Sequence, residues 1–207
     1  MKEKRLLALL EGREGERPRL HDAVLRAQAA GSLEVSGLSA TEEEVARLVR
    51  AGAAVGAAAP FTVEALLAWH RAATGSTTGL RAGARHREGG PPPAPVEFVA
   101  TRLQNLQEWL GTASSDALKP AQRGALVMAR VVEIAPFDDG NGRVARLAAS
   151  HEMTRAGGRP PVWIGQDRLP LQASLQAAFQ LHTEPLASLL DQAAERALDV
   201  MIRTLDG

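Results

Sequence analysis

The 207-residue sequence contains no cysteine and no tyrosine, and aromatic residues make up only 3% of it. The absence of cysteine excludes disulfides and zinc sites with thiolate ligands. No apolar run approaches the roughly 20 residues that a membrane-spanning helix needs. The charged start, Met1–Arg5, leads into only a short apolar stretch, which does not resemble a signal peptide. We therefore expect a cytoplasmic protein without a membrane segment.

The sequence also lacks an excess of charge of either sign, because 24 Lys and Arg residues balance 24 Asp and Glu residues. A broad electrostatic attraction to nucleic acid or to an anionic membrane surface needs a basic excess. The one basic cluster, around Arg81–Arg87, is short and has no aromatic residues between its charges. We therefore expect neither nucleic acid nor membrane as a partner.

Alanine and leucine supply most of the apolar residues, and they recur at helical spacing along nearly the whole chain. Residue types that start and stop helices flank these stretches, among them Thr41, Thr62 and Pro120 at starts and Gly111 at an end. The patterns predict an all-α protein with helices over residues 19–30, 41–52, 63–70, 99–110, 120–134, 141–156, 169–182 and 184–204. The helix over 120–134 is apolar on most faces, which is typical of a central helix.

The segment from Thr74 to Pro95 is different, because it holds five glycines, four prolines and four basic residues. We interpret it as a long exposed loop or an irregular β-hairpin. Loops of this length are uncommon in compact domains and are often functional.

The most informative stretch is Ile134–Arg146, which places an acidic residue, a Gly-Asn-Gly turn and two arginines directly before a helical pattern. A helix start leaves backbone N–H groups unpaired, and the helix dipole adds partial positive charge there. Gly140 and Gly142 allow the backbone to approach an anion closely. Arg143 and Arg146 are three residues apart and lie on one side of the helix, where they can hold phosphates.

Asp139 lies at the mouth of this turn. Because Mg²⁺ usually takes one or two carboxylates together with phosphate oxygens, the pattern indicates a site for a magnesium-bound nucleotide. The alternative is an ordinary Asp-Asp-Gly-Asn-Gly turn followed by solvated arginines. The residues alone leave both interpretations open. The Walker pattern of P-loop proteins is absent.

The stretch resembles the signature of the Fic family, His-x-Phe-x-(Asp/Glu)-Gly-Asn-Gly-Arg-x-x-Arg. The sequence matches it at seven positions and departs from it at the histidine, where Ala135 stands; the matches are Phe137, Asp139, Gly140, Asn141, Gly142, Arg143 and Arg146. The resemblance covers about residues 60–185. It implies a Fic-type helical bundle with a short β-hairpin or flap loop before the catalytic loop, formed by residues 60–207 and preceded by N-terminal helices in residues 1–59.

The resemblance implies that the chain is a protein adenylyltransferase, which transfers AMP from ATP to a Ser, Thr or Tyr hydroxyl of a target protein. It further implies that Asp139 holds Mg²⁺, that the Gly140–Gly142 turn binds phosphates together with Asn141, and that Arg143 and Arg146 bind phosphates as well. Phe137 would anchor the loop, and the family's histidine would take the proton of the hydroxyl. Self-modification on Ser or Thr and a homodimer are also compatible with the resemblance.

Ala135 removes that general base, because a methyl group cannot accept a proton. Such a base typically contributes about 10²–10⁴-fold to the rate. The residue is either an engineered inactivating change or a natural loss. The alternatives to an inactivated adenylyltransferase are a non-catalytic nucleotide-binding regulator and a transferase with another nucleotide or a phosphocholine donor.

Many Fic proteins carry an inhibitory helix with the pattern (Ser/Thr)-x-x-x-Glu-(Gly/Asn), whose glutamate pairs with the second arginine of the signature. The segment Ser32–Ser39 resembles the context of that helix, although Ala30 and Val35 depart from the pattern when Glu34 is taken as the glutamate. We therefore expect Glu34 to pair with Arg146 and to act as a regulatory residue. The alternative is that Glu34 is an exposed residue at a helix end.

Overall fold

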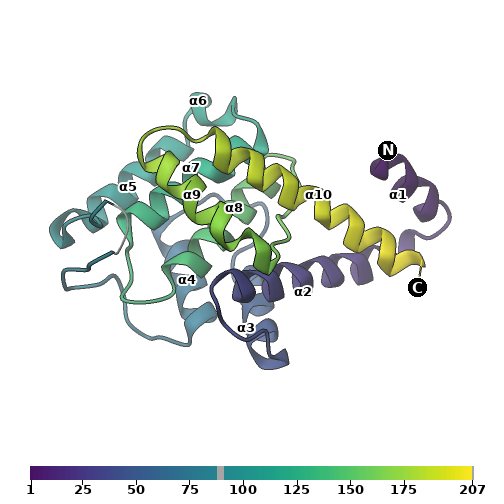
Figure 1. Ribbon diagram of the computed structural model, residues 1–207, viewed down its shortest axis with the longest axis horizontal. Helices are drawn as coiled ribbons and strands as arrows, with labels where there is room; N and C mark the ends of the chain where they lie inside the picture. Colours follow the sequence, from purple (N-terminus) through teal and green to yellow (C-terminus); the bar gives the residue numbers. More distant parts are fainter. Residues whose placement is uncertain (88–90, 207) are drawn as a thin grey trace.

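Helices joined by turns and loops make up the computed structural model, which describes residues 1–87 and 91–206 (Figure 1). No strand forms in these two ranges, which confirms the all-α prediction. The helices are α1 (Lys2–Leu10), η1 (Glu14–Glu16), α2 (Arg17–Val35), α3 (Glu42–Ala53), α4 (Val63–Thr74), η2 (Val96–Phe98), α5 (Val99–Leu110), α6 (Ala113–Asp116), α7 (Pro120–Ile134), α8 (Asn141–Arg155), η3 (Gly165–Asp167), α9 (Arg168–Phe179) and α10 (Glu184–Asp206). None of them is long and apolar enough to cross a membrane.

The residues expected to start helices do so through side-chain caps. Thr41 Oγ1 accepts a hydrogen bond from the N–H of Glu44 at 3.3 Å, and Thr62 Oγ1 accepts one from the N–H of Ala65 at 3.0 Å. Each cap satisfies one of the donors that a helix start leaves unpaired. Helices α1 and α6 were not predicted, and α1 in particular has no side-chain cap and no buried residue.

Helices α7 and α8 pack against each other as an antiparallel pair near the centre of the bundle (Figure 1). A glycine permits their close approach, because a Cβ on Gly124 would lie 2.6 Å from Cγ of Met153. The turn between Ile134 and Asn141 joins these two helices at one end. The residues that were expected to bind phosphate therefore lie at one end of this closely packed pair of helices.

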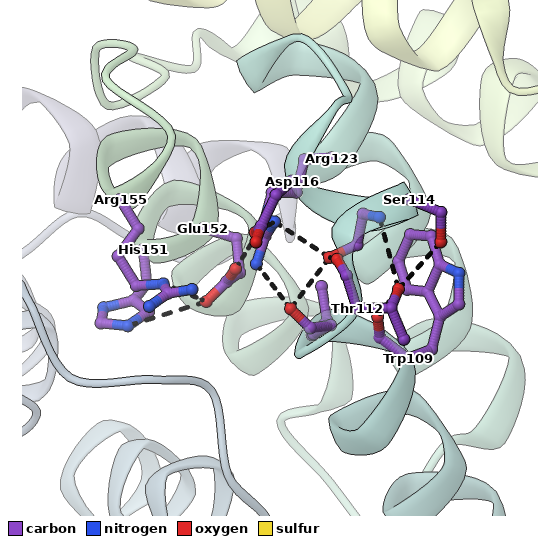
Figure 2. Close-up of polar contacts among 10 residues, drawn as sticks. Trp109, Thr112, Ser114, Asp116, Arg123, His151, Glu152 and Arg155 are labelled. Carbon is purple, nitrogen blue, oxygen red and sulfur yellow. Dashed lines mark hydrogen bonds and ion pairs between the residues drawn. The ribbon is translucent and has the colours of Figure 1, made fainter.

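At the other end of the pair, buried charges hold α7 to α8 (Figure 2). Arg123 Nε lies 2.7 Å from an oxygen of the fully buried Glu152, and Arg123 Nη1 lies 2.7 Å from Asp116 beyond the end of α5. Arg155 Nε lies 3.2 Å from the second oxygen of Glu152. Removing one partner of a buried pair leaves an uncompensated charge, so this cluster fixes the relative position of α7 and α8.

The expected β-hairpin is not seen in the described part of the segment between α4 and η2, and residues 88–90 of that segment lie outside the described residues. Arginine side chains hold the segment in place instead of strand pairing. Arg81 is buried, and its Nε donates to the carbonyl of Ala135 at 2.7 Å. Arg87 donates to the carbonyl of Val132. These cations satisfy carbonyls at the C-terminal end of α7, where the helix dipole favours positive charge.

Candidate anion-binding site

The turn between α7 and α8 starts at Ala135, which ends α7 in a left-handed conformation with φ 48° and ψ 63°. This conformation costs a non-glycine residue about 1–2 kcal/mol. Hydrogen bonds on both sides of the peptide hold it, since the N–H of Ala135 donates to Val131 O at 3.0 Å and its carbonyl accepts from Arg81. Ala135 is buried, so its methyl group lies inside the turn rather than on the surface.

The turn ends at Gly140, where two constraints require glycine. Its φ is 77°, and a Cβ would lie 2.6 Å from Cγ2 of Thr74 on α4. No side chain caps the start of α8 that follows. The first N–H groups of the helix, beginning at Asn141, therefore have no capping side chain among the described residues, and their binding of an anion stays a prediction.

Asn141 holds the shape of the turn through the backbone of Phe137. Its Oδ1 accepts from the N–H of Phe137 at 3.0 Å, and its Nδ2 donates to the carbonyl of Phe137 at 2.7 Å. Both functional groups of the Asn141 amide are thus engaged within the protein. Phe137 is fully buried, which agrees with its expected role as the anchor of the loop.

His70 is a residue of this site that the sequence reasoning missed. Its ring stacks on Phe137 with centroids 3.8 Å apart, and its Nε2 lies 3.1 Å from the carbonyl oxygen of Asp139. Burial lowers the pKa of His70 below its ordinary value of 6.5. The neutral ring therefore donates from Nε2 to Asp139, while its buried Nδ1 has no hydrogen-bond partner in the part of the chain that the structure describes. The sequence signal for His70 was its position on the otherwise apolar face of α4.

Arg143 and Asp139 form the exposed side of the site. Arg143 Nη2 lies 3.1 Å from Asp139 Oδ2, and Arg143 Nη1 donates to the carbonyl of Ala73 at 3.3 Å. The side chain of Asp139 is 85% exposed, so most of its surface remains open to solvent or a ligand.

Arg146 forms the buried side of the site. Its Nε donates to Ser32 Oγ and its Nη2 to the Ser32 carbonyl, both at 2.8 Å, and Nη2 also donates to Ser36 Oγ. Burial, followed by the nearby charge of Arg143, lowers the pKa of Arg146 to about 10, so the group stays cationic at neutral pH. Its Nη1 makes no hydrogen bond with the described residues and faces Gly142, where a Cβ would lie 3.3 Å away.

The expected ion pair between Glu34 and Arg146 is not formed. Helix α2 does reach Arg146, but it does so through Ser32 and Ser36, which are four residues apart and share one face. Glu34 lies between them in sequence, but its side chain contacts the start of η3 instead of Arg146. Its Oε2 accepts a hydrogen bond from the N–H of Gly165 at 3.1 Å. No carboxylate of the described residues pairs with Arg146.

The inhibitory-helix pattern identifies these serines when it begins at Ser32 instead of Ala30. With Ser32 as its first residue, the pattern (Ser/Thr)-x-x-x-Glu-(Gly/Asn) places Ser36 at the glutamate and Gly37 at the last position. The chain therefore has a hydroxyl where that pattern has a carboxylate.

A pocket of about 250 Å³ opens beside Arg146. It brings three cations together from separate segments, Arg87 before η2, Arg146 on α8 and Arg168 on α9, and none of the described residues that line it carries a carboxylate. Apolar side chains, including Phe179, form the rest of the wall, and the guanidinium of Arg87 lies 5.1 Å from the Phe179 ring centroid. The pocket therefore suits a ligand that has negative charge and an apolar part.

These features define a class: all-helical domains in which the turn between two central helices presents an open helix start and two arginines to an anion. Comparison with known proteins identifies the class. The sequence model of the Fic/DOC family matches residues 60–153, which include the whole turn. The chain belongs to the Fic/DOC family.

Curated relatives share part of the sequence. Protein adenylyltransferase Fic of Drosophila willistoni is 30% identical over 147 residues, which cover 69% of this chain and 29% of that protein. The Drosophila melanogaster protein of the same name is also 30% identical over 147 residues, with 69% and 30% covered. The chain thus spans about three tenths of the length of these relatives.

Solved structures share the fold. A Fic domain containing signaling protein from Bacteroides thetaiotaomicron has a TM-score of 0.76 at 18% identity, with 100% of this chain and 97% of that chain covered. Fic-1 from C. elegans has a TM-score of 0.73 at 20% identity, with 98% and 71% covered. IbpAFic2 in complex with adenylylated Cdc42 has a TM-score of 0.62 at 20% identity, with 86% and 62% covered.

Proposed function

We propose that this chain binds ATP and has the architecture to transfer AMP to a protein hydroxyl, and that Ala135 removes the group that would accept the hydroxyl proton. The observation that carries the proposal is the buried Arg146, which is cationic, is not neutralised by a described carboxylate and faces the open start of α8. Relatives named protein adenylyltransferase and a structural neighbour bound to adenylylated Cdc42 support the assignment of the reaction.

In this proposal the phosphates of ATP lie on the turn between Gly140 and Gly142. Backbone N–H groups at the start of α8 contact one side of the phosphate chain, and Nη1 of Arg146 contacts the other. Arg143 lies partly exposed between Asp139 and the bound phosphates. Asn141 contributes indirectly, because its amide holds the backbone of Phe137 in the shape that binds the anion.

The nucleoside of ATP would occupy the pocket beside Arg146. The apolar side chains of Leu171, Leu175 and Phe179 on α9 offer a wall for a flat base. Arg168, at the first position of α9, adds a further cation near the phosphates.

The residues present also fit a magnesium ion that arrives with the nucleotide. Among the described residues no three acidic or histidine side chains cluster to form a metal site of their own. A magnesium–nucleotide complex needs only one or two protein carboxylates, and the exposed carboxylate of Asp139 lies at the start of α8 to supply one. When bound, the ion would neutralise phosphate charge.

The transfer itself would join the target's hydroxyl oxygen to the α-phosphorus and break the bond from that phosphorus to the bridging oxygen of pyrophosphate. The proton of the hydroxyl must leave as the new bond forms. The methyl group of Ala135 has no lone pair to receive it, so we expect turnover to be slower by about 10²–10⁴-fold than with a base at this position. Binding of ATP does not depend on this group.

The second candidate function is a non-catalytic nucleotide-binding regulator. Two departures from the family's patterns favour it. Ala135 stands in place of the general base, and Ser36 stands in place of the inhibitory carboxylate. The segment of residues 75–87 lies beside the turn and is a candidate for contact with a target protein. A homodimer stays a prediction from the resemblance.

The variant Ala135→His, incubated with labelled ATP and a cell lysate, separates the two candidates. We expect labelled protein with this variant and none with Ala135→Asn, which adds a side chain of similar size without a comparable base. Because the chain has no tyrosine, labelling of the chain itself would fall on Ser or Thr, which mass spectrometry can locate. If the histidine variant binds ATP but labels neither itself nor the lysate, the chain is not an inactivated adenylyltransferase. Parallel assays with other labelled nucleotides and with a phosphocholine donor test the identity of the donor.

A further inference from the structure

A second and larger hollow lies between α5 and α7, away from the pocket beside Arg146. Its volume is about 610 Å³, within the range of roughly 300–1,000 Å³ typical of small-molecule sites. One stripe of each helix lines it: Arg102, Asn105, Leu106 and Trp109 on α5, and Leu126, Arg130, Glu133 and Ile134 on α7. It shares no lining residue with the pocket beside Arg146. We call it the α5–α7 groove.

The floor of the groove is apolar. Leu106 and Ile134 belong to the main core and are almost fully buried. The small part of each side chain that stays accessible lines the groove. Trp109 is half-buried and offers a flat aromatic surface. A ligand with an aromatic or aliphatic body would remove this surface from water, which is favourable.

The rim of the groove carries an excess of positive charge. Glu133 is the one carboxylate among the described residues that line the groove, and two guanidiniums share it: Arg130 Nη1 lies 2.6 Å from one oxygen and Arg102 Nη1 lies 3.6 Å from the other. Two cations around one anion leave one positive charge uncompensated. The longer distance at Arg102 leaves this guanidinium free to contact a second acceptor. An incoming carboxylate, sulfonate or phosphate can therefore bind between Arg102 and Arg130 without displacing Glu133.

We propose that the α5–α7 groove binds a small organic anion, with the apolar body on Leu106, Trp109 and Ile134 and the anionic group between Arg102 and Arg130. The site is independent of the proposed nucleotide site, because a different face of α7 forms it. It therefore adds a second ligand to the chain, whether or not the first site binds ATP.

Two fluorescent probes of nearly the same shape test the proposal: 8-anilinonaphthalene-1-sulfonate, which is anionic, and N-phenyl-1-naphthylamine, which is the same ring system without the sulfonate. We expect the wild-type chain to bind the sulfonate probe in the presence of excess ATP, which occupies the other pocket. The double variant Arg102→Gln/Arg130→Gln should bind the sulfonate probe about tenfold or more weakly and the neutral probe with unchanged affinity. The matched control Arg50→Gln, at an exposed position on α3, should bind both probes like the wild type.

The position of the probe can be read from the tryptophans. Of the three tryptophans in the chain, Trp69 and Trp163 are 1% exposed, whereas Trp109 lines the groove. The indole N–H resonance that disappears in Trp109→Phe should be the one that shifts when the sulfonate probe is added. Asn105→Trp, which changes an exposed residue and fills the groove, should abolish binding of both probes while leaving the helical circular dichroism unchanged.

The proposal is overturned if the wild type does not bind the sulfonate probe, or if the double arginine variant binds it as tightly as Arg50→Gln. It is equally overturned if the shifted resonance is not that of Trp109, or if Asn105→Trp leaves binding unchanged. The Trp109 resonance and the Asn105→Trp variant report on the groove itself, whether or not ATP occupies the other pocket, so a failure here is distinguishable from a failure of the proposed function.

Discussion

The contact between Ser36 and Arg146 yields the sharpest prediction of the structure. Ser36 accepts a hydrogen bond from Nη2 of the buried Arg146 and offers it a neutral oxygen. In Ser36→Glu the carboxylate would lie beside the same guanidinium and form an ion pair with it. The cation that the phosphates of ATP would otherwise contact is then already neutralised, so the variant should bind ATP more weakly.

The size of the effect follows from the kind of bond that is lost. Hydrogen bonds to charged groups contribute about 1.5–3 kcal/mol, which corresponds to about 10- to 150-fold in a dissociation constant. Because Ser36 lies at an exposed helix end, the new carboxylate would be partly solvated and the lower end of this range applies. We therefore expect a loss of about tenfold.

Isothermal titration of ATP into the wild type and the variants measures this loss. Ser36→Gln is the matched control, since glutamine has the size of glutamate but no charge, and Ser39→Glu places the same charge at an exposed position beyond the end of α2. Both controls should bind ATP within about twofold of the wild type. The reasoning is refuted if Ser36→Glu binds ATP as tightly as the wild type, or if Ser36→Gln is equally weak.

Three further predictions concern the turn and the two helices that it joins. Asn141→Ala should leave the buried N–H of Phe137 without a partner and its carbonyl with only the 3.4 Å contact from Arg85 Nη1, and should reduce the free energy of unfolding by about 1–3 kcal/mol, measured by urea denaturation; a change below about 0.5 kcal/mol would contradict the role of Asn141 as the residue that shapes the turn. Glu152→Gln should destabilise the chain by about 3–5 kcal/mol because Arg123 loses its buried counter-charge and keeps only the largely exposed Asp116, whereas Asp116→Asn should cost less than about 1 kcal/mol in the same assay. Because burial lowers the pKa of His70 in the folded state, the unfolded state binds the proton more readily, so stability should be complete above pH 6.5 and fall as the pH drops below that value. His70→Gln should show a smaller fall over this range, and an unchanged pH dependence would show that His70 is not the group responsible.

The sequence predicted the helices of the Fic domain because local signals specify them. Thr62 caps α4, Pro120 starts α7 and Gly111 follows the end of α5, and the apolar period between such signals fixes which face is buried. Helix α1 lacks these signals, since no side chain caps it and it buries no residue. It is defined by its contact with α10, which is almost 200 residues away in sequence.

For the candidate site, the sequence predicted where the helix begins but only some of the contacts around it. Local spacing was sufficient to place Gly140, Asn141 and Arg143 at a helix start. It could not show that His70 stacks on Phe137, because 67 residues separate them and only the packing of α4 on the turn brings them together. The interpretation of Glu34 failed for a related reason: the choice between Glu34 and Ser36 depends on how α2 is rotated about its axis, and packing against α8 decides that rotation.

The segment between α4 and η2 shows a third limit of prediction from the sequence. Its glycines, prolines and arginines predicted either a loop or a hairpin, because composition does not say where the arginine side chains bind. In the structure Arg81 and Arg87 satisfy the carbonyls at the end of α7, which strand pairing would not have done. A long-range contact of side chain with backbone thus decides the form of the segment.

We propose that the turn between α7 and α8 binds a nucleotide although Ala135 prevents efficient turnover. Titration of ATP into the unmodified chain, with Arg146→Ala as the comparison, tests it most directly. We expect saturable binding of ATP at one site in the unmodified chain and an affinity weaker by at least about tenfold in the variant. Absence of ATP binding by the folded, unmodified chain, or equal binding by Arg146→Ala, would contradict it.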